Sequence, residues 1–190
     1  MLHADTTAFV SEHILVDDII SAPQLLLNVG RHSVINPRVR ISYHNDDDKL
    51  PTADQKRLIV TVGDYSIIAD FCCLQIDPQS IAPMPIGNYT YIDPAVIIEP
   101  GVEIGNYCVI GAGSTIGRGT RIGNNCRVAA GTTLESGTVV ADKTAVSGRD
   151  EVLRVLDSGE NMSDSSRKRE MTMHTDYLLK VMSASVRRRH

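Results

Sequence analysis

Histidine is the side chain in this sequence most suited to acid–base or metal chemistry, and the chain contains six. Two of them, His32 and His44, fall in its central part. His44 adjoins the acidic run 46–48, which could raise its pKa, so this residue is either a general base on a loop or a solvated histidine. The next histidine is His174, so residues 45–173 offer no histidine ligand for a zinc ion.

The four cysteines, Cys72, Cys73, Cys108 and Cys126, are the other candidates for metal or redox chemistry. None of them forms a CxxC pair or a Cys/His spacing typical of metal ligation. We therefore expect no metal and no cofactor, and we interpret these residues as free thiols in a reducing compartment.

Composition and charge exclude several classes of function. The net charge of −4 gives no electrostatic case for nucleic acid as a partner. No apolar stretch reaches the roughly 18 residues of a membrane-spanning helix, so direct membrane insertion is not expected. The N-terminus also lacks the basic start of a secretory signal. These features favour a cytoplasmic protein.

An internal repeat of six residues dominates the middle of the chain. From Ile86 it divides without a gap into the blocks IGNYTY, IDPAVI, IEPGVE, IGNYCV, IGAGST, IGRGTR, IGNNCR, VAAGTT, LESGTV and VADKTA. Each block opens with an aliphatic residue, and the fifth residue is small or β-branched. This pattern predicts an all-β fold, a single-stranded left-handed parallel β-helix with three blocks per coil, followed by a C-terminal α-helix.

The first residue of each block should point inward and stack on the first residue three blocks later. Three interior ladders are therefore expected, namely Ile86, Ile104, Ile122 and Val140; Ile92, Ile110, Val128 and Val146; and Ile98, Ile116 and Leu134. The fifth position also faces inward where space is tight, which places Cys72, Cys108 and Cys126 inside as small apolar fillers and Cys73 outside.

The register divides the chain into four segments. Residues 1–28 form a degenerate first coil or N-terminal cap, and 29–148 form the β-helix, interrupted by an insertion at 42–61. Residues 149–170 are charged and rich in serine, which indicates a polar linker, with a short helix at its start as one option. Residues 171–190 show helical periodicity and end in a basic tail.

Two enzyme classes of this fold serve as alternatives. A hexapeptide-repeat acyltransferase commonly uses a loop histidine as general base, which leaves His44 as a candidate. A carbonic-anhydrase-like enzyme needs three converging histidines on a zinc ion, which the predicted coils lack.

The order of the segments resembles a known family. The run NVGRHSVINPRVRI, the insertion, the run VTVGDYSIIADFCCLQI, the loop PQSIAPMPIG and the terminal HTDYLLKVM are similar to the dynactin subunit 6 family, the small β-helical subunits of dynactin's pointed-end complex. The resemblance implies a non-enzymatic structural subunit without catalytic residues, supporting dynein-dependent microtubule transport and cargo or adaptor engagement. It implies a cytoskeletal location and, as partners, a sister β-helical subunit in a heterodimer, an actin-related protein and other pointed-end subunits.

A docking role needs an outward apolar surface, because β-helices present flat faces with regularly spaced side chains. The candidates for such a partner surface are apolar or aromatic residues at solvent-facing positions, namely Tyr91, Ile97, Val109, Val139 and Tyr177.

Overall fold

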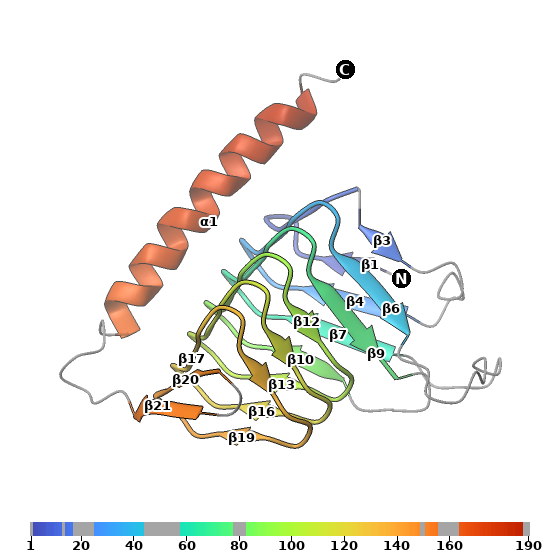
Figure 1. Ribbon diagram of the computed structural model, residues 1–190. Helices are drawn as coiled ribbons and strands as arrows, with labels where there is room; N and C mark the ends of the chain where they lie inside the picture. Colours follow the sequence, from blue (N-terminus) through green and yellow to red (C-terminus); the bar gives the residue numbers. More distant parts are fainter. Residues whose placement is uncertain are drawn as a thin grey trace.

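The computed structural model of the protein describes residues 2–12, 14–16, 25–43, 58–77, 83–148, 151–155 and 164–187. In these residues the chain winds through short strands, and successive strands join three different sheets, so that three strands complete one coil (Figure 1). All strand pairs are parallel except the last pair of one sheet. The predicted left-handed parallel β-helix with a C-terminal helix is confirmed.

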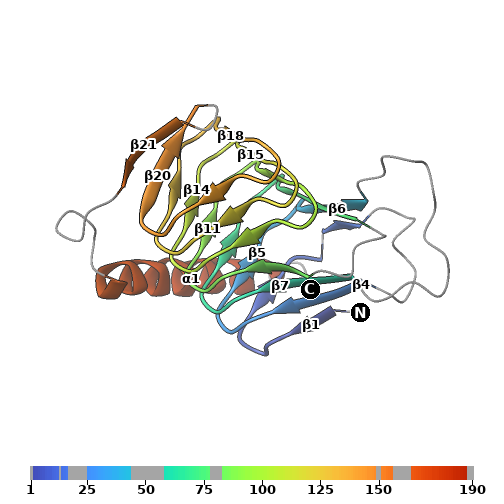
Figure 2. The ribbon, with the colours of Figure 1, turned by 90° about the horizontal axis from the view of Figure 1, so that it is seen from below.

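The three sheets form the three sides of each coil (Figure 2). Sheet A contains β1 (Leu2–Ala4), β4 (Leu25–Val29), β7 (Leu58–Val62), β10 (Met84–Ile86), β13 (Glu103–Ile104), β16 (Arg121–Ile122) and β19 (Val139–Val140). Sheet B contains β2 (Phe9–Val10), β5 (Val34–Ile35), β8 (Ile67–Ile68), β11 (Tyr91–Ile92), β14 (Val109–Ile110), β17 (Arg127–Val128), β20 (Thr144–Ser147) and β21 (Glu151–Val155). Sheet C contains β3 (Leu15–Val16), β6 (Arg40–Tyr43), β9 (Cys73–Ile76), β12 (Ile97–Ile98), β15 (Thr115–Ile116) and β18 (Thr133–Leu134).

The interior ladders have the register expected from the repeat. Ile86 pairs with Ile104 and Ile104 with Ile122 in sheet A, and the other two sheets repeat the same 18-residue step. Every residue of the three predicted ladders is buried. Branched aliphatic side chains suit these positions because their restricted rotamers pack well on a pleated surface.

Two stacks of residues stabilise the corner between sheets A and B. One is a column of asparagines, and the other is a column of glycines. The side-chain oxygen of Asn106 accepts the backbone N–H of Asn88 at 2.8 Å, and Asn124 does the same for Asn106 at 2.9 Å. The preceding Gly105 must lack a side chain, because a Cβ there would lie 2.6 Å from the Gly123 carbonyl oxygen of the next coil. The IGN blocks therefore encode a corner that stacks on itself.

Fifth-position side chains at the same corner donate hydrogen bonds to the next coil. Thr90 donates to the Gly105 carbonyl at 2.8 Å, and the Cys108 thiol donates to the Gly123 carbonyl at 3.0 Å. The Cys126 thiol likewise donates to the Ala141 carbonyl at 3.0 Å. Cys108 and Cys126 are buried as expected, but their thiols act as weak hydrogen-bond donors, as Ser and Thr hydroxyls do, rather than as purely apolar fillers.

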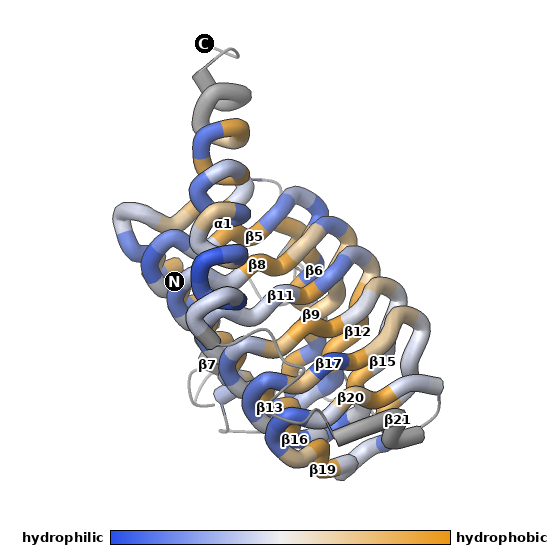
Figure 3. Tube along the Cα trace, turned by 90° about the vertical axis from the view of Figure 1, so that its left-hand side faces the viewer, coloured by the Kyte–Doolittle hydropathy of each residue, from blue (hydrophilic) through white to orange (hydrophobic). Residues whose placement is uncertain are grey.

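The single helix, α1 (Asp164–Arg187), lies along the outer face of sheet B and runs from the later coils back towards the first (Figure 3). Its Met171 packs on Val34 and Ile67, which point outward from β5 and β8 and are nevertheless fully buried. Leu178, Leu179 and Met182 extend this contact. The helix therefore serves as a fourth wall over one side of the solenoid.

Two elements extend into the segment expected to be a polar linker. Residues 151–155 form β21, which pairs antiparallel with β20, and α1 begins at Asp164, seven residues before the expected start. An acidic residue in the first turn suits the helix dipole, and the following Arg and Lys residues have good helix propensity, so the polar composition is compatible with the earlier start. Most of the insertion, residues 44–57, lies outside the described residues.

Candidate functional site

Four aromatic rings stack along the corner between sheets A and B. The fourth residue of the six-residue block at this corner is aromatic in four successive coils, namely His32, Tyr65, Tyr89 and Tyr107. The centroids of neighbouring rings lie 4.8, 5.1 and 5.1 Å apart. The rings are parallel to within 4°. All four residues have positive φ, between 53° and 59°, so the corner turns each side chain outward. We call these four residues the aromatic column.

Helix α1 follows this column from one end to the other. Arg167 donates a hydrogen bond from Nη1 to the carbonyl oxygen of Tyr107. Lys168 places its Nζ 5.7 Å from the centroid of the Tyr89 ring, a cation–π distance. Further along the helix, Asp176 reaches His32 at the other end of the column.

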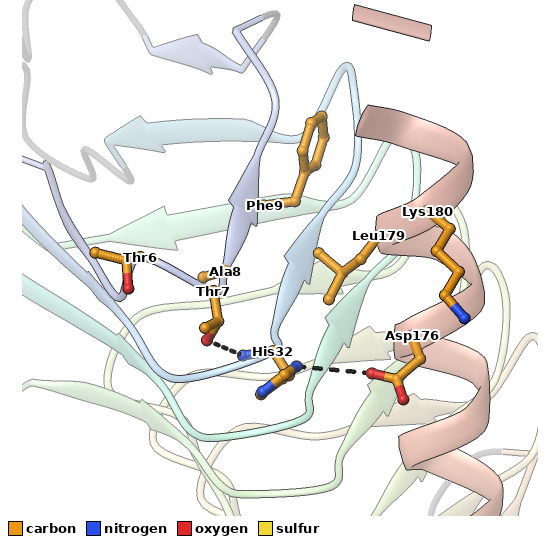
Figure 4. A pocket seen from close by; sticks show the side chains of 8 residues that line it. All are labelled: Thr6, Thr7, Ala8, Phe9, His32, Asp176, Leu179 and Lys180. Carbon is orange, nitrogen blue, oxygen red and sulfur yellow. Dashed lines mark hydrogen bonds and ion pairs between the residues drawn. The ribbon is translucent and has the colours of Figure 1, made fainter. Parts of the chain in front are cut away.

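An open cavity of about 520 Å³ lies where the first coil, His32 and α1 meet (Figure 4). The first coil contributes the turn before β2 and the start of that strand, and α1 contributes three residues from its second half. The lining residues are Thr6, Thr7, Ala8, Phe9, His32, Asp176, Leu179 and Lys180. The volume falls in the range of pockets that bind small molecules.

His32 and Asp176 are the titratable pair of this cavity. The Nδ1 atom of His32 lies 3.6 Å from Oδ1 of Asp176, and both side chains are partly exposed. The ring orientation is fixed by stacking on Tyr65, and the backbone N–H of His32 donates to Oγ1 of Thr7 at 3.1 Å. A proton carried on Nδ1 would point toward the Asp176 carboxylate, and Nε2 would then carry the lone pair.

The five residues expected to form a partner surface lie on different faces. Tyr91 and Val109 are adjacent on sheet B, but Ile97 lies on sheet C and Val139 on sheet A. Tyr91 is half-buried under α1, where its ring meets His174 edge-on at 5.4 Å. Tyr177, on α1, is 64% exposed. The structure therefore brings only Tyr91 and Val109 together.

The histidine at this site is not the one that the sequence analysis named as a candidate general base. His44 lies outside the described residues, whereas His32 is the histidine that borders a cavity. Sequence reasoning missed Asp176, Lys180 and the aromatic column. The column does have a sequence signature, because Tyr65, Tyr89 and Tyr107 recur at the same block position. Over the described ranges, no three His, Cys, Asp or Glu side chains are placed to hold a metal ion.

A family model supports the repeat. Residues 86–118, from the end of β10 to just past β15, match the model of the bacterial transferase hexapeptide, a unit of six repeats. These coils are hexapeptide repeats. Comparison of the whole sequence with curated proteins finds no match.

Solved structures share the fold over most of the chain. A Bacillus cereus protein assigned as an acetyltransferase is 19% identical, with a TM-score of 0.69, covering 95% of this chain and 92% of its own. AntD, a Bacillus cereus N-acyltransferase solved with dTDP and coenzyme A, is 15% identical with a TM-score of 0.56, covering 83% and 84%. A UDP-N-acetylglucosamine acyltransferase is 17% identical with a TM-score of 0.53, covering 96% and 78%. Likeness at these identities establishes the fold.

These comparisons correct the expectation that the chain is not an enzyme. The similar solved structures are acetyltransferases and acyltransferases, so the non-enzymatic interpretation is contradicted. They support the hexapeptide-repeat part of the family resemblance and give no support to the dynactin part. Within the described residues, no helix combines the length and apolar character needed to cross a membrane.

Proposed function

We propose that the protein is a hexapeptide-repeat acyltransferase in which His32 is the general base. The observation that carries this proposal is the pairing of His32 with Asp176 at the edge of a ligand-sized cavity. An imidazole that faces a carboxylate with one nitrogen and the substrate with the other is a usual arrangement of a histidine base. Asp176 is a positioning residue, since it acts through His32.

The reaction is acyl transfer from a thioester to an amine or hydroxyl group. Nε2 of His32 takes a proton from the acceptor while the acceptor nitrogen or oxygen attacks the thioester carbonyl carbon. The carbon–sulfur bond then breaks, and the departing thiolate takes the proton from the imidazolium ring. Coenzyme A is the thiol carrier that we expect, and AntD, which shares the fold, was solved with coenzyme A bound.

A conservative variant separates the catalytic role of His32 from its structural role. The other three members of the aromatic column are tyrosines, so His32→Tyr keeps a stacked ring at this position. The melting temperature should therefore change little. Removal of the base should lower the transfer rate by about 10²–10⁴-fold. The measurement is thiol release from acetyl-CoA across a panel of amine and hydroxyl acceptors.

Asp176→Asn completes this experiment. It should lower kcat with KM nearly unchanged, because Asp176 orients the base without contacting the acceptor. Wild-type protein that neither releases thiol with any acceptor nor gains thermal stability from coenzyme A would overturn the proposal. Wild-type rates in His32→Tyr would exclude His32 as the base.

Docking into a larger assembly is a second proposed role, compatible with catalysis. It rests on the resemblance to the dynactin subunit 6 family and on an exposed apolar line along α1, formed by Met173, Tyr177 and Val181 at 61%, 64% and 47% exposure. Affinity purification of the tagged protein should then recover a second hexapeptide-repeat protein and an actin-related protein. A clean homotrimer without these partners would contradict this role.

A further inference from the structure

The aromatic column ends at His32 although the solenoid continues for one more coil. In that first coil the strands β1 and β2 pair in register with β4 and β5, and Thr7 stands where His32 stands in the second coil. One face of the His32 ring stacks on Tyr65, so the other face is directed toward the first coil, whose residues 6–9 line the cavity together with His32 (Figure 4). The position of a fifth ring is therefore occupied by a small side chain.

Hydrogen bonds fix the orientation of the Thr7 side chain, so that it does not fill the space above the His32 ring. Its hydroxyl donates to Oδ1 of Asp5 at 2.6 Å and accepts the backbone N–H of His32 at 3.1 Å. Thr7 also lacks the positive φ shared by the four members of the column. Its side chain is thus directed onto its own turn, and the cavity takes up the room that a ring would fill.

The walls of this space match a flat ring with a polar substituent. Ala8 and Phe9 from the first coil and Leu179 from the helix form the apolar part of its wall, beside Thr6, Thr7 and Lys180. Asp176 provides a carboxylate beside the His32 ring. Stacked aromatic rings prefer centroid separations of about 4.5–7 Å, which the 4.8–5.1 Å rise of the column already provides.

We propose that the cavity binds a planar aromatic or heteroaromatic ring stacked on His32 as the fifth member of the column, and that this ring belongs to the acyl acceptor. The acceptor is a primary amine on a short arm of about two carbons, long enough to pass from the face of the imidazole to Nε2 at its edge. The assignment of the amine rests on the proposed acyltransferase function, whereas the stacked ring does not.

Binding can be measured with tryptamine as the probe, because the chain contains no tryptophan and all indole emission then comes from the ligand. Wild-type protein should change this emission saturably. Cyclohexylethylamine, which has the same arm on a ring that is not planar, should compete at least about tenfold more weakly. Coenzyme A and adenosine form a second arm, because the adenine of the acyl donor is the other planar ring available.

Variants at His32 separate stacking from proton transfer. His32→Tyr retains an aromatic face, so it should bind tryptamine within about threefold of wild type while losing acetyl transfer. His32→Ala should weaken binding at least about tenfold, with the melting temperature checking that it remains folded. If wild type binds tryptamine but transfers no acetyl group, the stacked ring stands and the acyltransferase function fails. Absence of saturable tryptamine binding, or displacement by adenosine as effective as by aryl amines, overturns this proposal.

Discussion

At the corner between sheets A and B, serine, threonine and cysteine replace one another at the fifth block position because each supplies one hydrogen-bond donor. Ser33, Ser66, Thr90, Cys108 and Cys126 each donate to a carbonyl of the next coil at the same corner. A thiol is a weaker donor than a hydroxyl, but it satisfies the carbonyl and leaves no polar atom unpaired. At the second corner the Cys72 thiol donates to the Asp93 carbonyl at 3.1 Å, and burial raises its pKa to about 11.

The buried thiols should resist alkylation. At pH 8 the Cys72 thiol remains protonated, because its raised pKa of about 11 lies well above that pH, and the thiolate is the reactive form. Cys73, on the outer side of β9, is the one cysteine in the described residues that is not fully buried. Iodoacetamide followed by mass spectrometry should modify Cys73 first in native protein and all four cysteines in denaturant. Equal modification of Cys72 and Cys73 under native conditions would contradict this assignment.

At the scale of elements, α1 does two things at once. It covers Val34 and Ile67, which would otherwise be exposed aliphatic residues on sheet B, and it delivers Asp176 to His32. Docking of the helix and completion of the candidate site are therefore one event. The same packing explains why Tyr91, taken from the sequence as a partner contact, has the chain's own helix as its partner.

Two methionines on α1 provide a matched test of this packing. Met171 is 8% exposed against sheet B, and Met173 is 61% exposed on the opposite side. Met171→Ala should cost about 2–3 kcal/mol of unfolding free energy, whereas Met173→Ala should change it by less than about 0.5 kcal/mol. Urea denaturation measures both. Equal effects of the two substitutions would mean that the helix does not pack through Met171.

The sequence predicts the structure of the coils well, but it does not predict how the helix docks on them. The ladders through Ile104 and Ile110 follow directly from the repeat, because neighbouring coils are related by a fixed number of residues. The contact of Asp176 with His32 joins residues 144 positions apart and depends on how a helix docks, which no local period specifies. Outward apolar residues at Val34 and Ile67 were the available indication that something covers sheet B.

For the whole molecule, stability depends on coils that contact only their neighbours in the stack. Each coil adds one residue to each interior ladder and one set of corner hydrogen bonds, as at Gly105, Asn106 and Cys108. A destabilising substitution in the middle of the stack therefore affects the coils on both sides. A destabilising substitution in an end coil affects only one neighbouring coil.

Ile104 tests this dependence. Ile104→Asp should cost more than about 4 kcal/mol, because it places an unpaired carboxylate between Ile86 and Ile122 in the interior ladder. Its neighbour Glu103 faces solvent near Arg121, at 3.5 Å, and Glu103→Gln should be nearly neutral. Thermal unfolding followed by circular dichroism compares the two. An Ile104→Asp variant with the wild-type melting temperature would refute the register.

The reversed direction of β21 determines where the solenoid can stop. A parallel sheet edge is a template on which a further coil, or the first coil of another molecule, can be added. Because β21 pairs antiparallel with β20, it presents the edge of sheet B with its strand polarity inverted. A parallel strand arriving there would meet a mismatched pattern of donors and acceptors. This short hairpin thus acts as a terminator against head-to-tail fibre growth on that side, so its removal would be expected to favour self-association through the end of the stack.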